Sequence, residues 1–141
     1  MTGPAPLPFR FKVGEETTWE MTEMRDVSSR LEGMLHLEDD VVILEWSRID
    51  TIEEVGLTGG KEEKRVSDLE GWEIPVEWLV EARHVGGWFL PAVELRARAL
   101  HVFEGIPGAK GASVRLRYAR RDGAIAREMV AAINGVVRGE G

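Results

Sequence analysis

The chain has 141 residues, of which 43% are hydrophobic and 30% charged, and these values predict a single soluble globular domain. It contains no cysteine, which excludes disulfides, thiol catalysis and thiolate metal sites. The formal net charge of -7 argues against bulk binding of nucleic acid. No apolar run approaches the ~18 residues needed to span a bilayer, and the first ten residues lack a secretory signal, so we expect a cytoplasmic protein.

The charge is unevenly distributed along the chain. Residues 1–70 carry 8 Lys+Arg and 17 Asp+Glu, whereas residues 71–141 carry 10 and 8. This asymmetry either marks an interaction surface or reflects two halves that attract each other within one domain. We favour the second interpretation, because single domains often mix charge in this way.

Prolines dominate the start of the chain. Because proline lacks a backbone N–H and fixes φ, Pro4, Pro6 and Pro8 favour a flexible proline-rich arm over residues 1–10. The remaining residues, 11–141, are then expected to form the single domain.

An acidic turn separates two strand-like runs. Residues 31–37 and 41–46 are rich in β-favouring residues, and Glu38-Asp39-Asp40 between them favours a hairpin turn. Residues 47–64 are punctuated by glycines and end in a run of charge, so they are predicted to form a loop.

Residues 74–85 fit two kinds of structure. Over residues 76–82 the apolar positions match a helix as well as a strand. We favour a tight turn over Val76–Trp78 and then a strand over Leu79–Val85, which Gly86-Gly87 ends as a hairpin turn.

Apolar and polar residues alternate most clearly in residues 92–100 and 113–118. One apolar face and one charged face are typical of an antiparallel sheet rather than a parallel one. Residues 103–111, which connect these two strands, have the composition of a loop.

Residues 122–138 predict a C-terminal helix. Asp122 is a suitable N-cap, and Gly139 can close the other end. One apolar stripe runs along the helix, formed by Ile125, Met129, Ile133 and Val136. The expected fold is therefore mainly β with one C-terminal α-helix.

The combination of these features resembles a bacterial pleckstrin-homology-like (PH/GRAM-like) domain over roughly residues 18–138. The residues that carry the resemblance are Gly33–Leu37, Ile74–Leu79, Gly87-Trp88 and the helix 122–138. It implies a barrel of two near-orthogonal antiparallel sheets that the helix caps. This fold hosts lipid binders, peptide binders and scaffolds, so the fold alone does not define an activity.

The resemblance also bears on lipid binding. In family members that bind phosphoinositides, the first hairpin carries lysines and arginines that hold phosphates. Here the corresponding turn is assigned to Glu38-Asp39-Asp40, whose carboxylates would repel an anionic headgroup. This difference from the family pattern argues against phosphoinositide binding.

Arginines concentrate on the two alternating strands. If these strands pair, Arg96, Arg98, Arg115 and Arg117 share one outer face, with Lys110 on the joining loop. Arginine forks suit carboxylates and phosphates. The favoured interpretation is a solvated face on which Glu94 and acidic residues of neighbouring strands supply the counter-charge.

Aromatic residues form the second candidate surface. Trp88 and Phe103, with Trp72, Phe89 and Ile106, either make an exposed apolar patch for a partner or cover the open end of a barrel. Trp46 and Trp78 lie within apolar runs and are expected to pack in the core or at an end of the barrel.

We expect no metal, cofactor or catalytic residue, because His36, His84 and His101 are widely spaced and no catalytic or phosphate-loop motif occurs. The predicted function is non-catalytic: a PH-like module that mediates protein–protein interaction or self-association. The alternative is weak peripheral binding to anionic membrane lipid through the arginine-bearing strand pair.

Overall fold

The computed structural model describes residues 3–20, 23–56, 59–106 and 109–139, with the backbone alone over residues 11–20. The chain is mainly β with one C-terminal helix, as the sequence predicts. Strands and helices follow in the order β1 (Leu7–Glu20), β2 (Glu23–Glu38), β3 (Val41–Gly56), β4 (Gly59–Val66), β5 (Glu70–Pro75), η1 (Val76–Trp78), β6 (Leu79–Val85), β7 (Ala92–Ala97), η2 (Leu100–Phe103), β8 (Ser113–Arg117), η3 (Arg120–Asp122) and α1 (Gly123–Val137), where η marks a 3-10 helix.

The strands form one antiparallel sheet, which is not closed. Its strand order is β4-β3-β2-β1-β8-β7-β6, and β5 also pairs with β3. Because β3 is long, two strands share its outer edge: β5 pairs with Val41–Trp46 and β4 with Ile49–Gly56. In the described backbone, β1 meets β8 at the single register pair Arg10↔Arg117.

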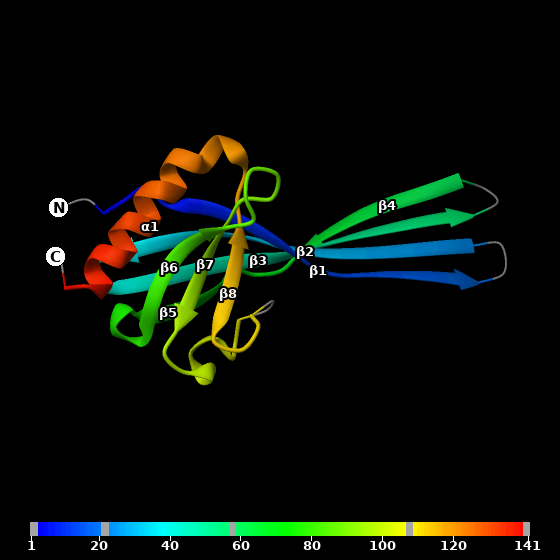
Figure 1. The fold of residues 1–141 in the computed structure, drawn as a ribbon. Coiled ribbons are helices and arrows are strands. Elements are labelled where there is room, and N and C mark those ends of the chain that lie inside the picture. Colours follow the sequence, from blue (N-terminus) through cyan, green and yellow to red (C-terminus); the bar gives the residue numbers. More distant parts are fainter. Residues whose placement is uncertain (1–2, 21–22, 57–58, 107–108, 140–141) are drawn as a thin grey trace.

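The long strands divide the molecule into a body and an arm (Figure 1). We define the arm as the part of β1–β4 that projects from the body, which comprises residues 14–20, 23–28, 50–56 and 59–66. The body holds the rest of the sheet and α1. The prediction of a loop over residues 47–64 is therefore wrong. β4 is exposed at every residue, and the described arm residues of β2 and β3 are mostly exposed or half-buried, so these strands need no apolar alternation.

The hairpin at Glu38-Asp39-Asp40 is confirmed, but it is the second hairpin of the chain. It joins β2 to β3, and Asp39 has a φ of 53°, which a turn aspartate tolerates. The first hairpin is β1–β2, and residues 21–22 between these strands lie outside the described residues. The assignment of the acidic turn to the first hairpin is thus wrong.

The N-terminal prediction also changes. Residues 7–10 begin β1 instead of belonging to a separate arm, and Leu7 and Phe9 are buried in the core. Burial explains the difference, since two apolar side chains at alternate positions can bind a strand to the sheet despite Pro8 between them.

The middle of the chain follows the favoured prediction. The turn over Val76–Trp78 is η1, and β6 follows it over Leu79–Val85. The strand predicted over residues 92–100 ends at Ala97, because Arg98 then turns its backbone N–H to the Trp78 carbonyl oxygen and η2 begins. The second alternating strand is β8.

The helix α1 is confirmed and closes the core of the body. Met129 and Ile133 of the predicted stripe are fully buried, and Ile125 and Val136 pack partly against the core. Asp122 stands at the N-cap without a side-chain capping hydrogen bond. Within the described residues, no helix has the length and apolar character that crossing a membrane requires.

Candidate interaction surface

Glu94 lies at the centre of the outer face of β6–β8. The strand register sets it between Arg83 of β6 and Arg115 of β8. Its carboxylate is buried and accepts a hydrogen bond from Arg83 Nε at 2.7 Å and from Arg115 Nε at 3.0 Å. Burial pushes the pKa of Glu94 upward, but the hydrogen bonds from Arg115 and Arg83 outweigh it, so the net pKa is lowered.

Two other predicted arginines of this strand pair also have partners. Arg96 donates to the Glu81 carboxylate at 2.8 Å, and Arg98, beyond the end of β7, donates to the Glu77 carbonyl oxygen at 2.9 Å. Lys110 is exposed on the connecting loop. Arg96, Arg115 and Arg117 share the outer face, as predicted, but Arg117 makes no ion pair with a described residue and lies opposite Arg10 where β8 meets β1.

The predicted aromatic patch is not assembled as expected. Phe103 is fully buried and Ile106 is buried beside it in the core, so the exposed-patch alternative is wrong for these two residues. Trp72 is half-buried and donates Nε1–H to the Val102 carbonyl oxygen at 2.9 Å. The 3-10 turn of η2 explains the change, because it directs Phe103 inward where a simple loop would leave it in water.

The two tryptophans expected in the core or at a barrel end differ in burial. Trp46 is buried in the core, and its indole N–H donates to Glu70 at 3.0 Å. Trp78 is 44% exposed, so it does not lie in the core. It is the last residue of η1, the tight turn that the sequence predicts at this place.

Exposed apolar side chains gather instead at the hairpin between β6 and β7. Trp88, Phe89 and Leu90 are 69%, 81% and 56% exposed, and we call them the aromatic tip. The Trp88 and Phe89 rings meet edge to face with centroids 5.1 Å apart. The Arg120 guanidinium stands 4.0 Å from the Trp88 ring centroid, a cation–π contact.

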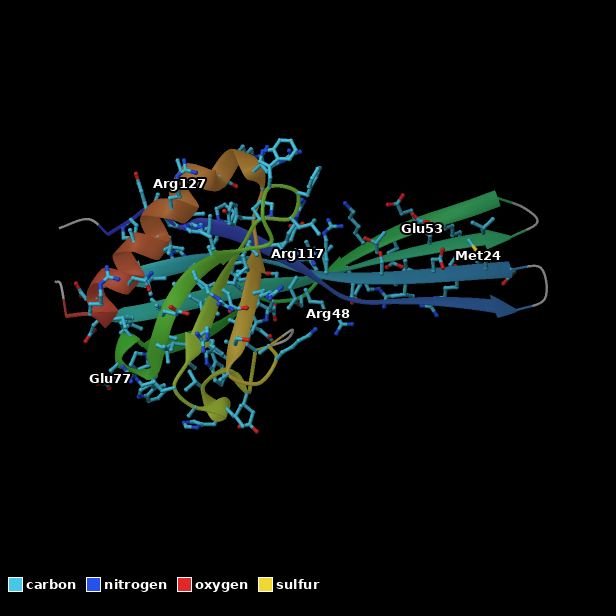
Figure 2. The ribbon with its side chains drawn as sticks, in the orientation of Figure 1. Met24, Arg48, Glu53, Glu77, Arg117 and Arg127 are labelled. Carbon is cyan, nitrogen blue, oxygen red and sulfur yellow. The ribbon has the colours of Figure 1, made fainter. Side chains whose placement is uncertain are left out.

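A cavity of about 460 Å³ opens beside the aromatic tip, where the body meets the arm. Arg10, Arg117 and Arg121 line it, so we call it the arginine groove. Figure 2 shows Arg117 near this junction. A backbone hydrogen bond links the segment of the tip to that of the groove, since the Tyr118 N–H donates to the Pro91 carbonyl oxygen at 3.2 Å.

The groove also has an apolar and an acidic component. Its apolar lining includes Met34, Leu69 and Tyr118, and Leu69 is 65% exposed. Its acidic lining is Glu32, Glu45 and Asp122. The guanidinium groups of the groove can therefore donate hydrogen bonds to a ligand, and its apolar side chains can pack against the same ligand.

Three arginines of this surface were not among the predicted binding residues. Arg120 and Arg121 follow the predicted strand 113–118 after one residue, so their closeness to that strand was a usable signal. Arg10 had no such signal, because only the pairing of β1 with β8 brings it to Arg117.

The described residues contain no group of three or more His, Cys, Asp or Glu side chains arranged to hold a metal ion. Comparison with known proteins gives no further indication: no family model, no curated protein and no solved structure matches the chain.

Proposed function

We propose that the chain is a non-catalytic, PH-like interaction module that binds a protein partner through the aromatic tip. One observation carries the proposal: three consecutive apolar side chains stand in water on a short hairpin whose base is fixed in the core. Contiguous exposed apolar surface of this kind marks interaction sites, and Trp and Phe are enriched in them.

The PH-like part of the proposal is supported by strand order. In the body, β1 links the set β5-β3-β2-β1 to the set β8-β7-β6, and the chain ends in a helix packed on the core. The narrow β1–β8 contact allows the two sets to turn away from each other. An experimental structure with the sets near right angles would support a PH-like barrel, and one flat sheet would contradict it.

The protein-binding role is tested with two variants of the full chain. Phe89→Asp charges the aromatic tip, and Leu100→Asp charges an equally exposed side chain (71%) outside it. A partner recovered from the source cells is purified and titrated against each variant by calorimetry. We expect about a tenfold loss of affinity for Phe89→Asp and a change within about twofold for Leu100→Asp.

Light scattering of the purified chain tests self-association in the same way, with Phe89→Asp shifting any dimer toward monomer. A chain that stays monomeric and binds no recovered protein contradicts the proposal. Equal losses in both variants would also contradict it, because the tip would then have no special role.

A second candidate function is weak binding to anionic membranes. The observation that favours it is the position of Arg120 and Arg121 directly beside the exposed tip. Arg96, Arg98 and Arg115 support it less, because each has a partner within the chain. Sedimentation with phosphatidylglycerol vesicles should then occur at low salt and fade as salt rises, and its absence at low salt contradicts this function.

A further inference from the structure

Most arginines of the described residues have a partner within the chain. Ion pairs or hydrogen bonds engage Arg25, Arg30, Arg48, Arg65, Arg83, Arg96, Arg98 and Arg115. Arg10, Arg117 and Arg121 make no ion pair with any described residue, and all three line the arginine groove.

The strand register adds an unfavourable charge contact at the same place. Arg10 and Arg117 stand directly opposite each other where β1 pairs with β8, and both are exposed. Like charges at directly opposed positions destabilise a sheet. Glu32 faces Arg10 from β2, but Arg30 already holds that carboxylate at 2.9 Å. The groove therefore contains guanidinium groups that form no ion pair with a described residue of the chain.

We propose that the arginine groove binds the carboxylates of an acidic segment in a protein partner. The proposal rests on the proposed function, since it names the chemistry of the partner that the aromatic tip would also contact. Guanidinium forks match carboxylates in geometry and charge. The apolar lining at Met34, Leu69 and Tyr118 would contact the side chains that stand between the acidic residues.

The acidic lining favours a peptide over a phosphate. Glu32, Glu45 and Asp122 stand in the same groove as the arginines, and they would repel a compact dianion such as a phosphate group. An extended peptide spreads its charge along its length. It also carries backbone N–H groups, which donate hydrogen bonds to carboxylates.

The probe is a blocked octapeptide of alternating Glu and Leu, and the matched probe replaces each Glu with Gln. Binding is measured by calorimetry on the full chain at low and high salt. We expect the Glu peptide to bind about tenfold or more tightly than the Gln peptide, and its affinity to fall as salt rises. Equal binding of the two peptides overturns the proposal.

Charge-reversal variants locate the binding site. Arg117→Glu and Arg121→Glu should each weaken binding of the Glu peptide about tenfold. Arg127→Glu is the control, because Arg127 is exposed on α1 outside the groove, and it should stay within about twofold. Arg117→Glu should also raise the urea midpoint of unfolding, since the new carboxylate faces Arg10. If Arg117→Glu lowers the urea midpoint and also loses binding, the loss would indicate damage to the fold. The result for Arg121→Glu then tests the proposal, and unchanged peptide binding by that variant overturns it.

Two further probes distinguish other sources of anion. Inorganic phosphate and phosphatidylglycerol vesicles are titrated against the same variants. If either one binds in an Arg117-dependent manner while the Glu peptide does not, the acidic-segment proposal is overturned. If the peptide fails but Phe89→Asp still abolishes binding of the purified partner, the proposed function stands without this inference. If both experiments fail, the proposed function falls as well.

Discussion

Glu94 shows at the residue scale how this sheet tolerates a buried charge. Its side chain is 5% exposed, whereas those of Arg83 and Arg115 are 49% and 65% exposed. The carboxylate therefore loses water while its two partners keep much of theirs. Two charge-assisted hydrogen bonds replace the lost hydration, so the arrangement is stable only while Glu94 is ionised.

Replacing Glu94 with glutamine should lower the free energy of unfolding by about 1–3 kcal/mol at neutral pH, because the amide keeps the shape but loses the charge. The pKa of Glu94 is lowered in the folded state, so its stabilisation is fully present above the ordinary pKa of glutamate, about 4.3. That stabilisation is lost as the pH falls through the lower, folded-state value. Urea unfolding from pH about 6 to about 3 should thus show a shallower decline in the variant than in the parent chain.

Some acid sensitivity should remain in the Glu94 variant. Hydrogen bonds from Ser29 and Arg48 lower the pKa of Asp50, so that residue contributes a dependence of the same sign. Glu81→Gln is the matched control, because its pair with Arg96 lies on the same face but is exposed, and it should cost less than about 0.5 kcal/mol. Equal losses in the two variants would contradict the special role of Glu94.

Gly33 is a residue whose missing side chain matters. A Cβ there would overlap the Glu45 carbonyl oxygen and lie 2.7 Å from Phe9 Cζ, and neither neighbour can move without disturbing the sheet or the core. We expect Gly33→Ala to destabilise the fold by about 2 kcal/mol or more, measured by thermal or urea unfolding. Gly71→Ala is the control, since its Cβ would meet Leu44 oxygen at an ordinary 3.8 Å and should change stability by less than about 1 kcal/mol.

At the scale of elements, the helix α1 and the strand β6 are joined by one side chain. Asn134 accepts a hydrogen bond from the Ala82 N–H and donates one to the Ala82 carbonyl oxygen, both at 2.8 Å. β6 is the last strand in the order of the sheet, so these backbone groups have no further strand to meet. The amide of Asn134 thus takes the place of a neighbouring strand and sets the position of the helix.

Asn134→Ala should cost about 2–4 kcal/mol in the free energy of unfolding, because it leaves one donor and one acceptor of Ala82 without a partner. It should also speed exchange of the Ala82 amide hydrogen, measured by NMR. Asn134→Asp should not restore stability, since a carboxylate can accept from the Ala82 N–H but cannot donate to the Ala82 oxygen. Full stability with aspartate, or loss of stability in Asn134→Ala without faster exchange at Ala82, would show that the paired hydrogen bonds are not the cause.

At the scale of the whole molecule, the arm and the body differ in how they are stabilised. In the body, side chains from β1–β3, β5–β8 and α1 share one core. In the arm, Ile52 is the one buried side chain among the described residues. The arm is held by strand pairing and by polar contacts such as Ser29 to Asp50 at 2.5 Å at its base. Lys61 and Lys64 on β4 give its outer edge the charge that discourages pairing with other chains.

Amide hydrogen exchange should separate these two regions. We expect the amides of β4 and of residues 23–28 to exchange by local opening, at a free energy below that of global unfolding. Leu35, Leu44 and Val93, which are fully buried in the body, should exchange only on global unfolding. Equal protection in both regions would mean that the arm and body unfold as one cooperative unit.

Local patterns in the sequence predicted several elements of the body, although not the start of β1 or β5. Period-two alternation predicted β7 and β8, an apolar stripe predicted α1, and the acidic turn predicted the β2–β3 hairpin. In each of these strands and in the helix, one face contacts the core and the other contacts water. Apolar and polar residues therefore follow one another along the sequence with the period of that element.

Tertiary structure alone determined the rest. Described side chains of the arm are mostly exposed or half-buried, so residues 47–64 show no regular apolar alternation. Phe103 ends η2 and is buried in the core, although its segment has the composition of a loop. The arginine groove depends on residues more than 100 positions apart, joined where β1 meets β8. Such contacts arise from the path of the whole chain through space, which no local pattern of residue types encodes.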